Sequence, residues 1–252
     1  MIALFISTPE TASPALQSAF SLSKSLKKEF GVICFTDSHS EIKSLENLVE
    51  QSGFEDAQLI VQNKKLGELS EFCEEMEISF FFIQLSENRS KSIQKYLNAC
   101  RDLRIPYLLY KDSFPSLNLT KVLVPVSFLE EDYEKAQFAS AFGRFCNSEI
   151  HLLQANDYGS KAGITTEKMT SLFDKFSLKY IVEKAEKDSF KIDKEAVQKA
   201  ERENFGIVLL SASRDYGLDD LFFGPKEQHL IKKSSVPILL INPRGDLYAL
   251  CD

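Results

Sequence analysis

The chain has 252 residues, of which 44% are hydrophobic and 20 are Phe, and this is enough to build one or two domains with a full apolar core. Its net charge is −7, which excludes a general attraction to nucleic acid or to an anionic membrane surface. The Lys pairs at 64–65 and 232–233 are too small to reverse this and are interpreted as solvated surface. We therefore expect a folded protein with no nucleic-acid partner.

The amino-terminal residues 1–6 are apolar but few, and they lead directly into Ser-Thr-Pro at 7–9. This pattern favours a first strand over a signal peptide. No apolar run reaches the roughly 18 residues that a membrane-spanning helix needs, so we expect a cytoplasmic protein without membrane insertion. The five Cys residues form an odd set without metal-type spacing, and we predict neither disulfides nor a zinc site.

Strand patterns alternate with amphipathic helix patterns through the first half of the chain. The expected strands cover residues 2–7, 31–35, 57–61, 78–85 and 105–110. The expected helices cover residues 14–29, 42–51, 66–76 and 90–103. Strict alternation of this kind predicts an α/β fold with a parallel sheet and helices on both faces.

The second half of the chain repeats this scheme. Its expected strands cover residues 121–126, 149–155, 180–185, 206–212 and 236–242, and its expected helices cover 130–146, 165–176, 193–203 and 225–233. The two halves end alike, with Ile-Pro-Tyr-Leu-Leu at 105–109 and Val-Pro-Ile-Leu-Leu at 236–240. We infer a tandem duplication, with domains at 1–111 and 120–252 joined by the turn-rich linker 112–120.

The halves differ after their fourth strand. The second half has a long connection, 213–224, where the first half has only 86–89. Ligands of open parallel sheets bind outside the carboxyl ends of the strands. A ligand pocket is therefore predicted in the second half.

The order of several pieces resembles the universal stress protein family. These pieces are the strand-like runs 122–126, 150–153 and 207–210, the loop fragments 217–218 and 221–224, and the final Val-Pro strand. The resemblance implies two five-stranded, Rossmann-like domains of the adenine nucleotide α-hydrolase type. It also implies that the domains pair through their last strands as a pseudo-dimer within one chain, and it leaves a further homodimer open. Some members of the family bind ATP and others do not.

The ATP-binding members carry Gly-x-x-Gly, nine residues, then Gly followed by Ser or Thr, because glycine lets phosphate approach the backbone closely. The matching positions here are Ser211, Arg214, Gly224 and Pro225. One glycine remains, and the last position has lost both the hydroxyl and the N–H. The acidic residue that the family places after its first strand is replaced by Ser127. The nucleotide motif is therefore degenerate.

A pocket built from the remaining residues defines the candidate ligand site. Its members are Pro125, Ser127, Ser211, Ser213, Arg214, Gly224 and Lys226. The favoured function is a non-catalytic stress-response or regulatory module that acts through a protein partner or an unknown small ligand, with no cofactor. One alternative is an ATP or AMP sensor in which Arg214 and Lys226 replace the lost backbone donors. A third is an enzyme of the α-hydrolase group.

No catalytic or metal-binding set is evident. The three histidines, His39, His151 and His229, have no partner at ligand or triad spacing, and His151 is expected on a strand within the core or on a sheet face. The adjacent acids at 219–220 and 130–132 diverge along a helix and are interpreted as solvated first-turn residues. We therefore predict no catalytic residue and no metal site.

Overall fold

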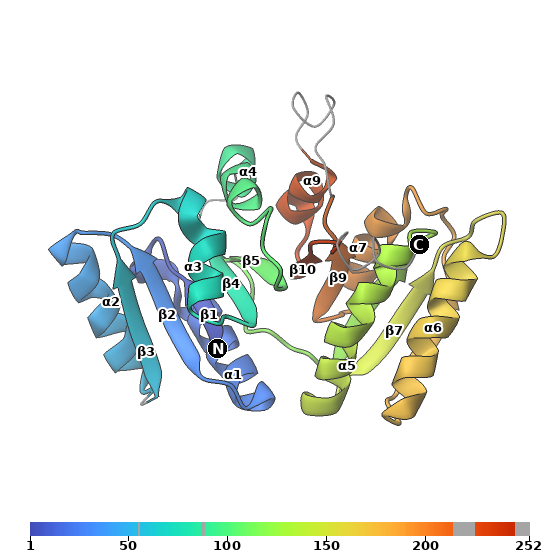
Figure 1. The fold of residues 1–252 in the computed structure, drawn as a ribbon, viewed down its shortest axis with the longest axis horizontal. Coiled ribbons are helices and arrows are strands. Elements are labelled where there is room, and N and C mark those ends of the chain that lie inside the picture. The colour runs from blue at the N-terminus through green and yellow to red at the C-terminus, as the bar shows by residue number, and fades with distance from the viewer. Residues whose placement is uncertain (55, 87–88, 214–224, 245–252) are drawn as a thin grey trace. The chain divides into compact units, whose positions relative to one another are not determined.

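The computed structural model describes residues 1–54, 56–86, 89–213 and 225–244. The chain divides into two compact units, Met1–Ser116 and Leu117–Asp252. Each unit has the alternating strand–helix order that the sequence predicts, and the α/β fold class is confirmed (Figure 1). Pairing of the two halves through their last strands stays a prediction.

The first unit is a five-stranded parallel sheet in the order β3-β2-β1-β4-β5. Its strands are β1 (Ile2–Phe5), β2 (Phe30–Phe35), β3 (Ala57–Gln62), β4 (Phe80–Leu85) and β5 (Tyr107–Lys111). Its helices are α1 (Ser13–Leu26), α2 (His39–Ser52), α3 (Leu69–Glu75) and α4 (Ser90–Ala99), with short 3₁₀ turns η1 (Pro9–Thr11) and η2 (Leu66–Glu68). Right-handed crossovers in this strand order place α1 and α2 on one face and α3 and α4 on the other.

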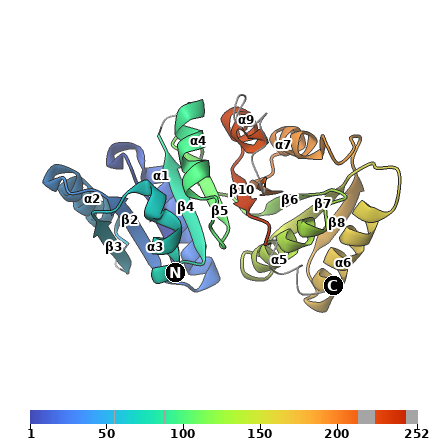
Figure 2. The ribbon, with the colours of Figure 1, turned by 45° about the horizontal axis from the view of Figure 1, so that its top comes forward.

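The second unit repeats this order as β10-β9-β6-β7-β8. Its strands are β6 (Lys121–Val126), β7 (Glu149–Gln154), β8 (Tyr180–Lys184), β9 (Ile207–Ser211) and β10 (Ile238–Ile241). Its helices are α5 (Lys135–Phe145), α6 (Lys161–Lys175), α7 (Ile192–Arg202) and α9 (Lys226–Lys233), and the 3₁₀ turn η3 (Glu130–Glu134) precedes α5. Figure 2 shows α5 and α6 on one face of this sheet and α7 and α9 on the other.

The central strands carry the core of each unit. Every residue of β1 and β4 is buried, as are the first four of β9. Such continuous apolar strands are typical of a parallel sheet with both faces covered. Among the described residues, no helix is long and apolar enough to cross a membrane.

Five of the turns from helix to strand share one backbone conformation at a residue other than glycine. Among the residues that the structure describes, the five non-glycine residues with positive φ have values between 50° and 55°. They follow α1, α3, α5, α6 and α7, and they are Lys27, Glu77, Asn147, Ser177 and Asn204. The first of them explains one boundary, because the helix predicted over 14–29 ends at Leu26, where Lys27 turns left-handed and its N–H bonds back to the last turn.

Candidate functional site

The candidate site lies where β6 and β9 separate. These strands pair at only two positions, Val122 with Ile207 and Leu123 with Val208, whereas β1 and β4 pair along all of β1. Pro125 follows the last of these pairs, where its missing N–H costs no ladder hydrogen bond to β9. The separation leaves room for side chains between the ends of the two strands.

A carboxylate fills this space. Asp132, in η3, is 3% exposed. Its Oδ2 accepts the backbone N–H and the hydroxyl of Ser127, both at 2.6 Å, and its Oδ1 accepts the hydroxyl of Ser211 at 2.8 Å. Two predicted pocket residues thus bind the same internal carboxylate. The expectation that the acids at 130–132 are all solvated is wrong for Asp132, because the chain folds it back over the end of β6.

Lys135 completes this network. It is 1% exposed, and its Nζ lies 2.7 Å from Asp132 Oδ1 and donates to the carbonyl of Pro125 at 2.5 Å. Burial alone would raise the pKa of Asp132, but the charge of Lys135 and hydrogen bonds from Lys135 and Ser127 lower it further than burial raises it. The Asp132 carboxylate therefore stays ionised inside the unit.

A second internal carboxylate lies at the start of α9. The N–H and hydroxyl of Ser213 both donate to Glu227 Oε1, at 2.5 and 2.6 Å. Glu227 is 2% exposed, and within the described part of the chain its other oxygen has no hydrogen-bond partner. A carboxyl group supplied by the protein thus already accepts the hydrogen bonds of both Ser213 donors.

Lys226 is the most accessible of the described candidate residues. Its side chain is half exposed, and its Nζ lies 2.9 Å from Asp193 Oδ2. Burial lowers the pKa of Lys226, but the nearby carboxylates of Asp193, Glu227 and Asp132 outweigh that effect and raise it overall. Lys226 is therefore a charged group beside the network and not a member of it. The remaining candidates, Arg214 and Gly224, lie outside the described residues.

Sequence reasoning missed Asp132, Lys135 and Glu227. The spacing of Asp132 and Lys135 is a recognisable i, i+3 ion-pair signal. Nothing in the sequence says that the pair is buried, because a charged pair at this spacing is usually on a solvated helix face. Only the topology, which places η3 over the strand ends, shows that this pair is buried and not on a solvated helix face.

Three loops of the second unit meet beside this network. The hydroxyl of Ser189 accepts the N–H of Phe128, at 2.8 Å, and donates to the carboxylate of Asp157, which also accepts the N–H of Ser189 at 2.9 Å. Phe190 packs edge-on against Phe128, with ring centroids 5.4 Å apart, yet is 85% exposed. Hydrogen bonds therefore fix the loops after β6, β7 and β8 to one another.

The buried histidine belongs to a different part of the unit. His151 on β7 is 7% exposed, as expected for a sheet-face residue, and its two ring nitrogens lie 2.7 Å from Glu149 and 3.1 Å from Glu183. Lys199 also pairs with Glu183, at 3.0 Å. The carboxylates flank opposite sides of the ring and do not converge on one point. Among the described residues, no group of three His, Cys, Asp or Glu side chains could hold a metal ion.

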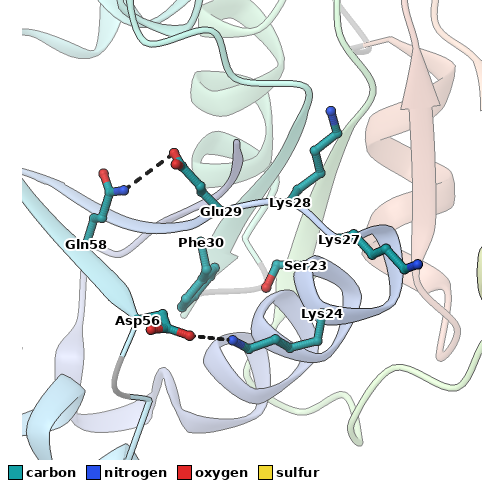
Figure 3. Close-up of a pocket in the computed structure, with 8 residues that line it drawn as sticks. All are labelled: Ser23, Lys24, Lys27, Lys28, Glu29, Phe30, Asp56 and Gln58. Carbon is teal, nitrogen blue, oxygen red and sulfur yellow. Dashed lines mark hydrogen bonds and ion pairs between the residues drawn. The ribbon is translucent and has the colours of Figure 1, made fainter.

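A hollow of about 640 Å³ lies on the first unit, where the sequence predicted no pocket. Eight residues line it: Ser23, Lys24, Lys27, Lys28, Glu29, Phe30, Asp56 and Gln58. It lies at the amino ends of β2 and β3, away from the strand ends where ligands of such sheets bind. Figure 3 shows Lys24 reaching Asp56, at 2.7 Å, while Lys27 and Lys28 point in different directions. These charges do not converge on a common anion.

Comparison with known proteins adds one finding. No protein-family model matches the sequence, and no curated protein matches it either. Among solved structures, a universal stress protein from Archaeoglobus fulgidus DSM 4304 superposes with a TM-score of 0.68 at 17% identity, with 97% of each chain covered. The chain has the universal stress protein fold.

Two further structures share this fold. A functionally unknown protein from Pseudomonas aeruginosa PAO1 gives a TM-score of 0.63 at 10% identity, over 99% of this chain and 95% of the other. A provisionally assigned universal stress protein from Pseudomonas aeruginosa UCBPP-PA14 gives 0.60 at 10% identity, over 99% and 94%. Because coverage is nearly complete, the universal stress protein fold extends through both units. Identities this low transfer the fold and not the ligand.

Proposed function

We propose that this protein is a non-catalytic stress-response or regulatory module of the universal stress protein type. It acts in the cytoplasm through a protein partner or a small ligand, and it does not bind ATP in the way its fold otherwise permits. The proposal concerns the candidate site at the ends of β6 and β9, since this is where a ligand of the fold would bind.

The observation that carries the proposal is the pair of internal carboxylates. Asp132 takes the hydroxyls of Ser127 and Ser211, and Glu227 takes both donors of Ser213. These are the donors on which a bound phosphate or ribose would depend. A nucleotide would have to displace a buried carboxylate, and the charge of that carboxylate would repel its phosphates. Binding would therefore cost more free energy than the displacement of water.

The chemistry of the remaining groups supports a non-catalytic role. Burial raises the pKa of the Cys34 thiol to about 11 and that of Cys73 to about 12. Such thiols stay protonated and are poor nucleophiles at neutral pH. His151 is occupied on both nitrogens by carboxylates. None of these groups is available as a nucleophile or a general base.

The decisive experiment is thermal unfolding of the nucleotide-stripped protein with and without millimolar Mg-ATP and AMP, together with an ATP hydrolysis assay. Ligand at about 100 times its dissociation constant adds roughly 2.7 kcal/mol, which corresponds to a shift of several degrees. We expect no shift and no hydrolysis. A shift that saturates with ATP would contradict the proposal.

A second candidate function is a nucleotide sensor with side-chain donors. The half-exposed ammonium of Lys226 at the start of α9 favours it, because that is where a phosphate would need a cation. This function predicts an ATP-dependent shift that Lys226→Ala and Arg214→Ala both remove. If the shift survives in both variants, side-chain compensation is not the mechanism of binding.

A further inference from the structure

The outer edge of the second unit presents an apolar strand. β8 pairs with β7, and none of the described segments pairs with its other side (Figure 2). Ile181 and Val182 are 42% and 43% exposed. The corresponding edge strand of the first unit, β3, keeps its three central apolar residues half-buried. Exposed edges of this kind template the addition of another strand.

The direction of the backbone groups follows from the bonds to β7. The carbonyl of Lys179 accepts the N–H of Ile150 at 3.0 Å, and the N–H of Ala185 donates to Gln154 at 2.7 Å. Successive residues of a strand point their backbone groups to alternate sides. The N–H and carbonyl groups of Tyr180, Val182 and Lys184 therefore point outward.

We propose that β8 is a homodimerisation edge, on which β8 of a second copy of this chain pairs antiparallel with Val182 opposite Val182 of the copy. A two-fold axis through this position makes the contact self-complementary. Tyr180 then lies opposite Lys184 of the copy, and each outward residue exchanges both of its backbone hydrogen bonds. The inference does not depend on the function proposed above.

Charge complementarity favours a second copy as the occupant. The hydroxyl of Tyr180 donates to Asp174 on α6 at 2.9 Å. Lys184 of the copy, lying across the Tyr180 ring, reaches the Asp174 carboxylate, and the symmetry repeats this pair. On the opposite face, Glu183 comes opposite Ile181 of the copy. The charge of Glu183 is already matched by Lys199, and its other oxygen is hydrogen-bonded to His151, so the pairing places no uncompensated charge at the interface.

Sedimentation equilibrium of the full chain at micromolar concentration tests the proposal. We expect a dimer, and a monomer for Val182→Pro, because proline lacks the outward N–H that the partner strand needs. The matched control is Val61→Pro on β3. The N–H of Val61 also points outward, since the carbonyl of the next residue, Gln62, accepts the N–H of Thr36. This control should remain a dimer.

A charge exchange keeps the test valid if a proline variant unfolds. Lys184→Asp should weaken the dimer about tenfold or more, because it brings like charges together. The double variant Asp174→Lys/Lys184→Asp should restore it. A monomeric wild-type protein would overturn the proposal and leave a strand of another protein as the occupant of the edge. The proposal would also be overturned if neither Val182→Pro nor Lys184→Asp weakened the dimer.

Discussion

The two units satisfy the polar groups at the carboxyl ends of their central strands differently, although the positions in the fold correspond. These strands are β1 and β4 in the first unit and β6 and β9 in the second. The register of β1 and β4 ends with Phe5 opposite Ile83, so the next residues, Ile6 and Gln84, lie opposite each other. The register of β6 and β9, continued three residues beyond Leu123 and Val208, brings Val126 opposite Ser211. Gln84, fully buried, accepts the N–H groups of Ser7 and Thr8 and donates to the Thr8 carbonyl, the Thr11 hydroxyl and the Asp112 carboxylate. In the second unit the Asp132–Lys135 ion pair supplies the hydrogen-bond partners of the strand ends.

The difference shows how a duplicated fold can solve one problem in two ways. Diverging strand ends leave backbone and hydroxyl groups that must find partners once water is excluded. An amide supplies donors and an acceptor without charge. A carboxylate supplies acceptors only, and it needs Lys135 beside it to be tolerated in the interior. At these strand ends the second unit therefore depends on a buried ion pair, whereas the first unit relies on a neutral amide.

Lys135→Met should produce the largest effect. It leaves Asp132 buried without its cation, which typically costs about 3–5 kcal/mol. Urea unfolding followed by far-UV circular dichroism measures the loss, and amide hydrogen exchange locates it in the second unit. The double variant Asp132→Asn/Lys135→Met should lose less than the single variant. An equal or greater loss in the double variant would show that the charge imbalance is not the cause.

Gln84→Leu is the matching change in the first unit. It leaves the partly buried N–H groups of Ser7 and Thr8 without their acceptor, at about 0.5–1.5 kcal/mol for each lost hydrogen bond. Hydrogen exchange should rise around β1 and β4 while the second unit stays protected. Gln84→Glu is the informative control, since it keeps the acceptors but brings a carboxylate next to Asp112. We expect Gln84→Glu to be tolerated only at low pH.

The opposite ends of these strands offer a smaller contrast. Gly206 precedes β9 where Ser79 precedes β4, and a Cβ at Gly206 would lie 1.3 Å from the Asn118 carbonyl oxygen. Gly206→Ser should therefore cost about 1–3 kcal/mol through forced backbone movement. Ser79→Gly should cost under about 1 kcal/mol. Equal losses in the two variants, measured by urea unfolding, would mean that the linker carbonyl can move aside freely.

Acidification should give the smallest and most selective effect. Because the pKa of Asp132 is lowered in the folded state, its contribution is present above the unfolded value of about 3.9 and is lost as pH falls through the folded value. Unfolding free energy followed from pH 5 downward should fall less steeply in Asp132→Asn than in the wild type. Parallel curves would mean that Asp132 does not contribute to acid sensitivity.

The sequence was enough to predict the strand–helix order and the α/β class, because buried parallel strands and amphipathic helices have distinct periodicities. It placed Ser127 and Ser211 at strand ends correctly, since both follow apolar runs. It could not reveal what those hydroxyls bind. The answer depends on η3 folding back so that Asp132 and Lys135 enter the interior. Burial of a charged pair is a tertiary property that local pattern does not encode.

The left-handed residues after the helices mark positions where substitution by glycine would increase the stability of the fold. A non-glycine residue in this conformation costs roughly 1–2 kcal/mol relative to its preferred region, and Asn is the best tolerated. Lys27, Glu77 and Ser177 have no such tolerance. Glycine at these three distant positions should add nearly independently. That gain remains unused here, as expected of a protein that selection holds above a threshold of stability and does not drive to a maximum.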